Sequence, residues 1–378
     1  MPALPPPSPR TAPFEVHEGT HTLHLLTPDE EVQWSFDRRG RLIAGHDGGF
    51  HFLVGMDGRV LLRDRRERTR PPPVRLTFEE VAPLYDRVAA DIAAVLAFSL
   101  EENTARAWLA LAAARDAETY RRDAAAFAEV YQPVSVLPPD CYRALVVQLA
   151  EGCCYNRCAF CTLYQDVPYR VKTAADLEAH LDGIAALFGD ALALRNKVFL
   201  GDANALALDQ ALLLDHIEHV RRRFPDVAAG GFHSFLDTFT RPLKTEAQLS
   251  ALRGAGLRRV YVGLESGHRP LRAALRKPGT VAGTREVVAA CRRAGVGVGI
   301  IVLVGAGGAE FAAGHLRDTM EAIRAMDLGE TDLVYLSPLT GAMQPPGLEI
   351  ASQTAAFRAA LSESPFKVAR YDLRRWIY

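Results

Sequence analysis

The chain has 378 residues, long enough for one large domain with additions or for two or three domains. It is 49% hydrophobic and 24% charged, the balance of a globular protein with a sizeable core, and its net charge of −1 gives no general attraction to nucleic acid or anionic membranes. No apolar run approaches the ~20 residues that span a bilayer. The proline-rich beginning, residues 1–13, is predicted to be a disordered tail rather than a signal peptide.

Residues 14–132 are predicted to form a small antiparallel β-meander followed by helices, because short alternating segments are separated by turn sequences. The strands are expected at His21–Leu26, Val32–Phe36, Arg41–Ala44, Phe50–Val54 and Arg59–Leu62. Thr77 and Glu80 then form a capping box at the start of a helix. A second helical segment covers roughly Asn103–Val130, and the proline-marked stretch Gln132–Asp140 is predicted to be a linker.

Residues 140–340 repeat a strand–loop–helix pattern with strands too hydrophobic to be half exposed. The strands are expected at Ala144–Leu149, Lys197–Leu200, Gly231–Phe235, Arg259–Leu264, Val296–Val304 and Asp332–Leu336. Such alternation indicates an α/β fold with a parallel sheet covered by helices, and six units favour a partial (β/α)6 TIM-like barrel. Residues 346–378 are predicted to be a short C-terminal extension with one helix at Gln353–Leu361.

Four of the six cysteines lie between residues 153 and 161, directly after the first strand of the predicted barrel. Cys154, Cys158 and Cys161 have the spacing C-x3-C-x2-C, with Phe160 before the last of them. Thiolates are soft ligands that select iron–sulfur clusters or zinc. Clustered cysteines in a chain without an export signal indicate a reducing cytoplasm and a metal rather than disulfides.

The cysteine loop is open to two other interpretations. The three positions would also form one stripe of a helix as small buried residues. A zinc site, as in a zinc-stabilised binding module without enzymatic activity, needs four ligands, and the nearby fourth cysteine, Cys153, is adjacent to Cys154 and points in a different direction in most backbones. Three thiolates on a four-iron cluster leave one iron open, and the sequence favours this cluster.

A third interpretation, a dinucleotide-dependent oxidoreductase, depends on the glycines Gly305 and Gly307 after the fifth strand. The third glycine of that motif would fall at Glu310, whose carboxylate would repel a pyrophosphate at the helix start. The motif is also on the fifth unit of the fold rather than the first. It is therefore disfavoured.

With Cys154, Cys158, Phe160 and Cys161 in this pattern, the chain resembles the radical S-adenosylmethionine (radical SAM) enzymes over residues 140–340. The order of motifs is nearest to the subgroup with oxygen-independent coproporphyrinogen oxidases, the Elongator catalytic subunit and methylthiotransferases. The resemblance implies that the three cysteines bind a 4Fe-4S cluster and that Phe160 packs near the adenine of S-adenosylmethionine.

Three further stretches resemble motifs that hold S-adenosylmethionine in this family. Gly201 and Asp202 begin the turn that stands where the family has Gly-Gly-Glu, which holds the methionine amino group. The sequence VYVGLESG resembles the fourth-strand motif, which implies that Glu265 and Ser266 hold the ribose and methionine ends. The strand GIIVLVGAGG, with Gly305, is similar to the strand that backs the adenine.

The resemblance implies an enzyme that cleaves S-adenosylmethionine reductively to a 5′-deoxyadenosyl radical, which abstracts hydrogen from a substrate that the sequence leaves unidentified. It also implies a low-potential electron donor such as flavodoxin or ferredoxin. We expect a small-molecule substrate, and we expect neither a membrane nor a nucleic acid as partner. His233, on the third strand, is our hypothesis for a catalytic residue that contacts the substrate.

Overall fold

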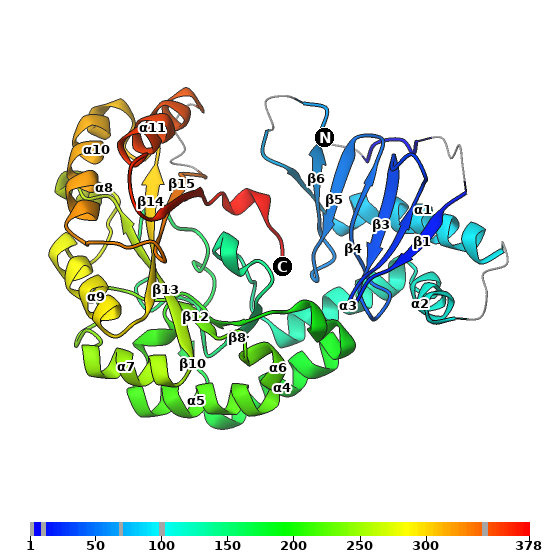
Figure 1. The fold of residues 1–378 in the computed structure, drawn as a ribbon, viewed down its shortest axis with the longest axis horizontal. Helices are drawn as coiled ribbons and strands as arrows, with labels where there is room; N and C mark the ends of the chain where they lie inside the picture. Colours follow the sequence, from blue (N-terminus) through cyan, green and yellow to red (C-terminus); the bar gives the residue numbers. More distant parts are fainter. Residues whose placement is uncertain (1–3, 9–12, 68–70, 98–102, 342–346) are drawn as a thin grey trace. The chain divides into compact units, whose positions relative to one another are not determined.

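The computed structural model describes residues 4–8, 13–67, 71–97, 103–341 and 347–378. Most of the tail that was predicted to be disordered, residues 1–13, lies outside these ranges. The chain divides into two compact units (Figure 1). The first contains residues 1–135, 182–195 and 374–378, and the second contains residues 136–181 and 196–373.

The first unit is built on an antiparallel sheet whose seven strands lie in sequence order, which makes it a meander. The strands are β1 (Glu15–Glu18), β2 (Leu23–Leu26), β3 (Val32–Phe36), β4 (Leu42–Asp47), β5 (Phe50–Val54), β6 (Val60–Asp64) and β7 (Val74–Leu76). Five of them were expected from their alternating pattern. The outer strands β1 and β7 were not expected, because they are short and have no buried face of their own apart from Leu76.

Three helices complete this unit: α1 (Phe78–Ala97), α2 (Thr104–Ala113) and α3 (Ala117–Val130). The capping box is present, since Glu80 Oε2 accepts from the Thr77 amide at 2.8 Å. The single helical segment expected over residues 103–130 is two helices. The second begins at Asp116, whose carboxylate accepts from the amide of Thr119.

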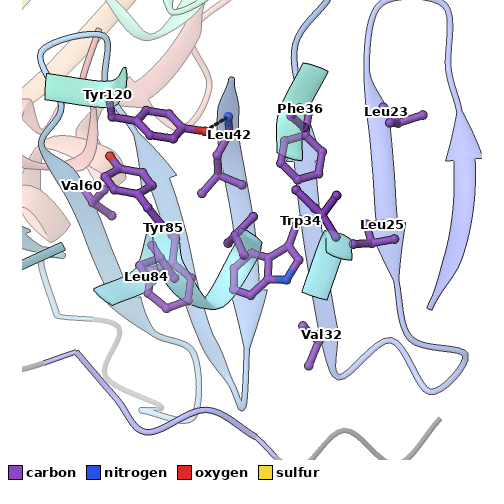
Figure 2. Close-up of a cluster of buried hydrophobic side chains, with 14 of the residues drawn as sticks. Leu23, Leu25, Val32, Trp34, Phe36, Leu42, Val60, Leu84, Tyr85 and Tyr120 are labelled. Carbon is purple, nitrogen blue, oxygen red and sulfur yellow. Dashed lines mark hydrogen bonds between the residues drawn. The ribbon is translucent and has the colours of Figure 1, made fainter. Parts of the chain in front are cut away.

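The core of the first unit consists of apolar residues from the sheet and from the helices (Figure 2). Tyr85 and Tyr120 stack with ring centroids 3.9 Å apart, and the Tyr120 hydroxyl accepts from the Leu42 amide at 2.8 Å. Two segments that are distant in sequence complete this unit. The Arg41 guanidinium donates to the Leu187 carbonyl at 2.7 Å, and the carbonyl of Tyr378 accepts from Met56 N at 2.6 Å.

The second unit contains a parallel sheet of seven strands in the order β16-β15-β14-β13-β12-β11-β8. The strands are β8 (Leu145–Gln148), β11 (Val198–Gly201), β12 (Phe232–Phe235), β13 (Leu257–Glu265), β14 (Gly297–Val304), β15 (Leu333–Pro338) and β16 (Lys367–Arg370). Among the described residues β8 and β16 do not pair with each other, so the barrel is open. The predicted partial barrel is confirmed, but the C-terminal extension adds a seventh strand, β16, parallel to β15.

Helices cover the outside of this sheet (Figure 1). They are α4 (Ala174–Phe188), whose last residues belong to the first unit, α5 (Gln210–Arg223), α6 (Pro225–Ala228), α7 (Glu246–Gly254), α8 (Arg269–Ala274), α9 (Val281–Arg293), α10 (Gly308–Arg324) and α11 (Gly347–Ala360). A short pair of strands, β9 (Ala150–Glu151) and β10 (Arg170–Val171), closes the base of the cysteine loop. Within the described ranges, none of the helices combines the length and apolar character needed to cross a membrane.

Candidate functional site

A cavity opens among the ends of strands and loops in the second unit. Its walls come from the cysteine loop after β8, from the loop after β11, from the carboxyl-terminal parts of β12 to β14, and from the loop after α8. Half of the lining residues carry large apolar or aromatic side chains: Val136, Tyr155, Phe160, Tyr164, Phe235, Leu236, Phe239, Tyr261, Val262 and Ile301. A cavity with apolar walls and a few convergent polar groups is typical of a small-molecule site.

The cysteine loop reaches this cavity because glycine allows a sharp turn directly after β9. Gly152 has a φ of +71°, and a Cβ atom there would lie 2.6 Å from the Val167 carbonyl oxygen, so a larger residue does not fit. Cys158 and Cys161 line the cavity, and so does Cys153. All six cysteines of the chain are free thiols.

Cys154 is the most exposed of the three predicted ligands, and its Sγ accepts a hydrogen bond from Asn204 Nδ2 at 2.8 Å. Burial raises the pKa of Cys158 to about 11 and also raises the pKa of Cys154 and of Cys161. These thiols therefore ionise near neutral pH only when a cation binds them. Three such soft donors on one loop beside a cavity fit an iron–sulfur cluster with one iron left open for another ligand.

An ion pair is among the polar groups that line the cavity. Glu265 Oε1 lies 3.0 Å from Lys277 Nζ, and both side chains are largely buried. Glu265 has a φ of +58°, a left-handed conformation that is uncommon for a residue with a side chain, and the register of β13 with β14 shifts between Gly263 and Glu265. Strain of this kind is concentrated at functional sites. Lys277 was not predicted from the sequence.

A buried arginine joins the two loops that carry this ion pair. Arg272 is 5% exposed, and its guanidinium donates to the carbonyl of Leu264 at 2.5 Å and to those of Pro278 and Gly279 at 3.1 and 3.2 Å. Leu264 precedes Glu265, and Pro278 follows Lys277. The arginine therefore sets the distance between the two halves of the ion pair.

Ser266 and Gly305 lie behind the cavity wall rather than in it. The Ser266 side chain is 0% exposed, and its hydroxyl lies 2.9 Å from Nδ1 of the buried His315. The Gly305 amide donates to Gln353 Oε1 at 2.8 Å. Ser266 follows β13 and Gly305 follows β14. The cavity is lined by other residues of these two strands, among them Glu265 of β13 and Ile301 of β14.

The turn after β11 presents different residues from those that the sequence singled out. Asp202 is buried beneath the turn, where its carboxylate accepts from Gln148 Nε2 at 2.9 Å and from the Gly152 amide at 3.3 Å. Burial raises the pKa of Asp202 to about 7. Gly201 is also buried, and the cavity is lined instead by Ala203 and Asn204, the next two residues along the chain.

His233 lies on β12, where its Nδ1 is 3.1 Å from the hydroxyl of Tyr261. Burial lowers the pKa of His233 to about 4, so the imidazole is neutral near pH 7. The Tyr261 hydroxyl also donates to Asp140 at 2.6 Å, and Tyr335 donates to the same carboxylate at 2.7 Å. His233 is not among the lining residues of the cavity, but Tyr261 is. The imidazole thus contacts a residue of the cavity rather than the cavity itself.

The structure therefore brings four of the predicted residues to the cavity, namely Cys158, Phe160, Cys161 and Glu265. Cys154 lies beside the lining residue Asn204. The other predicted residues, Gly201, Asp202, His233, Ser266 and Gly305, are not among those that line it. Sequence reasoning did not single out Lys277, because its contact with Glu265 depends on the fold of the loop after α8. Asn204 was within the turn that the sequence identified.

Residues 150–323 match the family model described as the Radical SAM superfamily. This segment, 174 of the 378 residues, is similar to radical SAM domains, and the enzymes of that superfamily use a 4Fe-4S cluster and S-adenosylmethionine. The match covers the cysteine loop and the strands up to β14, which are the elements that build the cavity. It supports neither the zinc-stabilised module nor the dinucleotide-dependent oxidoreductase.

Solved structures of radical SAM enzymes also resemble the chain. The methyltransferase TsrM from Kitasatospora setae is 23% identical, with 57% of this chain and 38% of that one covered and a TM-score of 0.39. Coproporphyrinogen III oxidase (HemN) from Escherichia coli is 15% identical, with 64% of this chain and 56% of that one covered and a TM-score of 0.45. This chain thus spans less than two thirds of either structure. No curated protein sequence matches it.

Proposed function

We propose that Cys154, Cys158 and Cys161 bind the cluster and that the adjoining cavity holds S-adenosylmethionine together with a substrate. The observation that carries this proposal is that two of these cysteines and the strained, buried pair of Glu265 and Lys277 line one cavity. When bound, the cluster supplies the electron that cleaves the sulfonium of S-adenosylmethionine to methionine and a 5′-deoxyadenosyl radical.

The ion pair supplies both charges that the methionine end of S-adenosylmethionine requires. Lys277 can pair with the carboxylate of that methionine, and Glu265 can accept from its ammonium group or from the ribose hydroxyls. In the chain without ligand the two side chains neutralise each other at 3.0 Å. The ligand would replace one buried ion pair with two charge-assisted contacts, so it would not leave a buried charge unpaired.

The remaining walls favour an apolar or aromatic substrate. Phe160 also packs against a buried apolar cluster that includes Leu271 and Leu275, and it lines the cavity, where an adenine could stack on its ring. Tyr261, Phe235 and Ile301 form apolar wall on the strands. Because His233 contacts Tyr261 but is not among the lining residues, we infer that it positions Tyr261, while its direct contact with the substrate stays a prediction.

The electron would come from a low-potential donor such as flavodoxin or ferredoxin. Arg157, within the cysteine loop, and Arg276, beside Lys277, are exposed. These exposed arginines, one within the cysteine loop and one adjacent to Lys277 in the chain, favour an approach by a partner of negative surface charge, because complementary potentials raise the rate of encounter.

The proposed function is tested by reconstituting the full chain with iron and sulfide without oxygen, and then adding dithionite and S-adenosylmethionine. We expect methionine and 5′-deoxyadenosine to form, which chromatography detects. The absence of both products from protein that contains four irons would refute the proposal.

The binding role of the ion pair is tested separately from cleavage. Lys277→Met should weaken binding of S-adenosylmethionine to the reconstituted protein by roughly tenfold or more, because a charge-assisted contact is lost. Equilibrium dialysis measures the Kd. Arg276→Met is the matched control, since it removes an exposed positive charge from the adjacent residue and should leave the Kd unchanged. Equal Kd values for the two variants would contradict the assignment.

A further inference from the structure

Asn204 is a buried amide whose Nδ2 end contacts a predicted cluster ligand. The side chain is 2% exposed and lines the cavity. Its Nδ2 lies 2.8 Å from Cys154 Sγ. Its Oδ1 is buried and has no hydrogen-bond partner among the residues that the structure describes. Unpartnered buried oxygens are rare in folded proteins, so this amide is built to contact something that binds in the cavity.

The chemistry of sulfur determines which way this amide must face. A thiolate that ligates a metal has no proton and only accepts hydrogen bonds. The amide offers an N–H donor at one end and an acceptor at the other, so Nδ2 must face Cys154 when that residue is a ligand. The oxygen is then left for a donor in the cavity, such as the ammonium group of a bound S-adenosylmethionine.

The backbone around Asn204 holds the side chain in this place. The carbonyl of Asn204 accepts from the Ala207 amide at 3.0 Å, which closes a turn of helix directly after it. The next residues, Ala205 and Leu206, are both 0% exposed. The backbone that carries the amide is therefore anchored in the core directly after Asn204.

We propose that Asn204 raises the reduction potential of the group that Cys154 holds, by donating a hydrogen bond to the ligand sulfur. Reduction adds one electron from an external donor, with no bond formed or broken and no proton transferred, so the ligand sulfurs become more negative. A hydrogen bond to sulfur is stronger when the sulfur carries more charge, and it therefore stabilises the reduced state more than the oxidised state. Asn204 would thus be a positioning and tuning residue of the radical-generating site. This inference rests on the proposed function, in which Cys154 is a cluster ligand.

The test is a redox titration of the reconstituted full chain, without S-adenosylmethionine, followed by electron paramagnetic resonance. Asn204→Leu has similar volume and no donor, and at the wild-type midpoint its ratio of reduced to oxidised cluster should fall on the order of tenfold, a shift of about 59 mV to more negative potential for one electron. Asn204→Asp also removes the donor and adds a negative charge, so its shift should be larger and in the same direction.

Thr238→Val is the matched control. Thr238 lines the same cavity and is 3% exposed, but its hydroxyl bonds to Thr284 at 3.1 Å and not to a cysteine. This variant should keep the wild-type midpoint. A shift in Asn204→Asp without one in Asn204→Leu would show a simple effect of charge and would overturn the role of the hydrogen bond.

Iron analysis separates the remaining outcomes. If the wild type binds no iron, the proposed function itself fails. If the wild type and Thr238→Val bind four irons while neither Asn204 variant binds any, the amide is needed to retain the cluster and the tuning role is wrong. If all four proteins bind iron and have one midpoint potential, the hydrogen bond has no electronic effect and the inference fails while the proposed function stands.

Discussion

His315 provides the most quantitative prediction, because it is a buried imidazole directly behind the turn that carries Glu265. It is 0% exposed, and its Nε2 lies 3.1 Å from the Leu303 carbonyl, which can only accept. Nε2 therefore carries the proton, and Nδ1 accepts from the hydroxyls of Ser266 and Thr319 at 2.9 and 3.1 Å. A second proton on Nδ1 would turn this nitrogen from an acceptor into a donor and place a positive charge in a fully buried site.

The size of the effect follows from the pKa. Burial lowers the pKa of His315 from 6.5 to about 4. As the pH falls below 6.5, the unfolded chain takes up a proton while the folded chain does not, so stability is lost progressively until the pH reaches about 4. A difference of about 2.5 pKa units corresponds to about 3 kcal/mol. His233, whose pKa burial also lowers to about 4, should contribute a similar loss.

The assay is urea unfolding of wild type and His315→Gln at a series of pH values between about 7 and about 4, followed by far-UV circular dichroism. Glutamine can donate to the Leu303 carbonyl and accept from a hydroxyl, but it does not titrate. All three tryptophans belong to the first unit, so tryptophan fluorescence identifies the transition of that unit. The free energy of unfolding of the second unit should fall by about 3 kcal/mol less in the variant than in wild type.

The reasoning would be refuted if wild type and His315→Gln lost the same free energy over this range. That result would mean that the imidazole is protonated as readily in the folded chain as in the unfolded one. The burial of His315 behind Glu265 would then make no contribution to the pH dependence of the free energy of unfolding.

Two further predictions concern polar contacts, one in each unit. The Asp140 carboxylate accepts from two tyrosine hydroxyls and from Arg259, and Asp140→Asn weakens this acceptor. The substitution should lower the free energy of unfolding by about 3 kcal/mol, whereas Tyr335→Phe should lower it by about 1 kcal/mol. Equal losses in urea unfolding would show that the carboxylate is not the centre of this network. Trp34→Phe removes the donor that lies 2.8 Å from Asp91 in the core of the first unit. It should cost about 2 kcal/mol, and an unchanged midpoint in urea would contradict this contact.

The sequence was informative where the pattern is local. Strands β3 and β5 have the bounds that alternation predicts, because each has one face in the core. Strand β1, with the sequence EVHE, has no such face, and only its pairing with β2 makes it a strand. Strand β16 was missed for the same reason, since it depends on pairing with β15. Pairing between distant segments leaves no periodic signal in a short strand.

The same distinction applies to the candidate site. The cysteine spacing is local, so it could be recognised directly. The direction of the Ser266 side chain, away from the cavity, could not be predicted from the sequence. The register of β13 shifts between Gly263 and Glu265, and a shift of one residue reverses which side chain faces the cavity. Lys277 reaches Glu265 because the buried Arg272 joins their loops, and a contact of that kind is invisible to spacing and periodicity.

The most direct test of the account compares two adjacent cysteines. Spacing assigns Cys154 as a ligand, whereas the structure places its neighbour Cys153 in the lining of the cavity. Iron and acid-labile sulfide should be measured per chain after anaerobic reconstitution of Cys153→Ala and Cys154→Ala. We predict about four irons per chain for Cys153→Ala, as for wild type, and loss of the intact cluster for Cys154→Ala. The reverse result, with iron kept by Cys154→Ala and lost from Cys153→Ala, would contradict the assigned ligands and the role of Asn204 that depends on them.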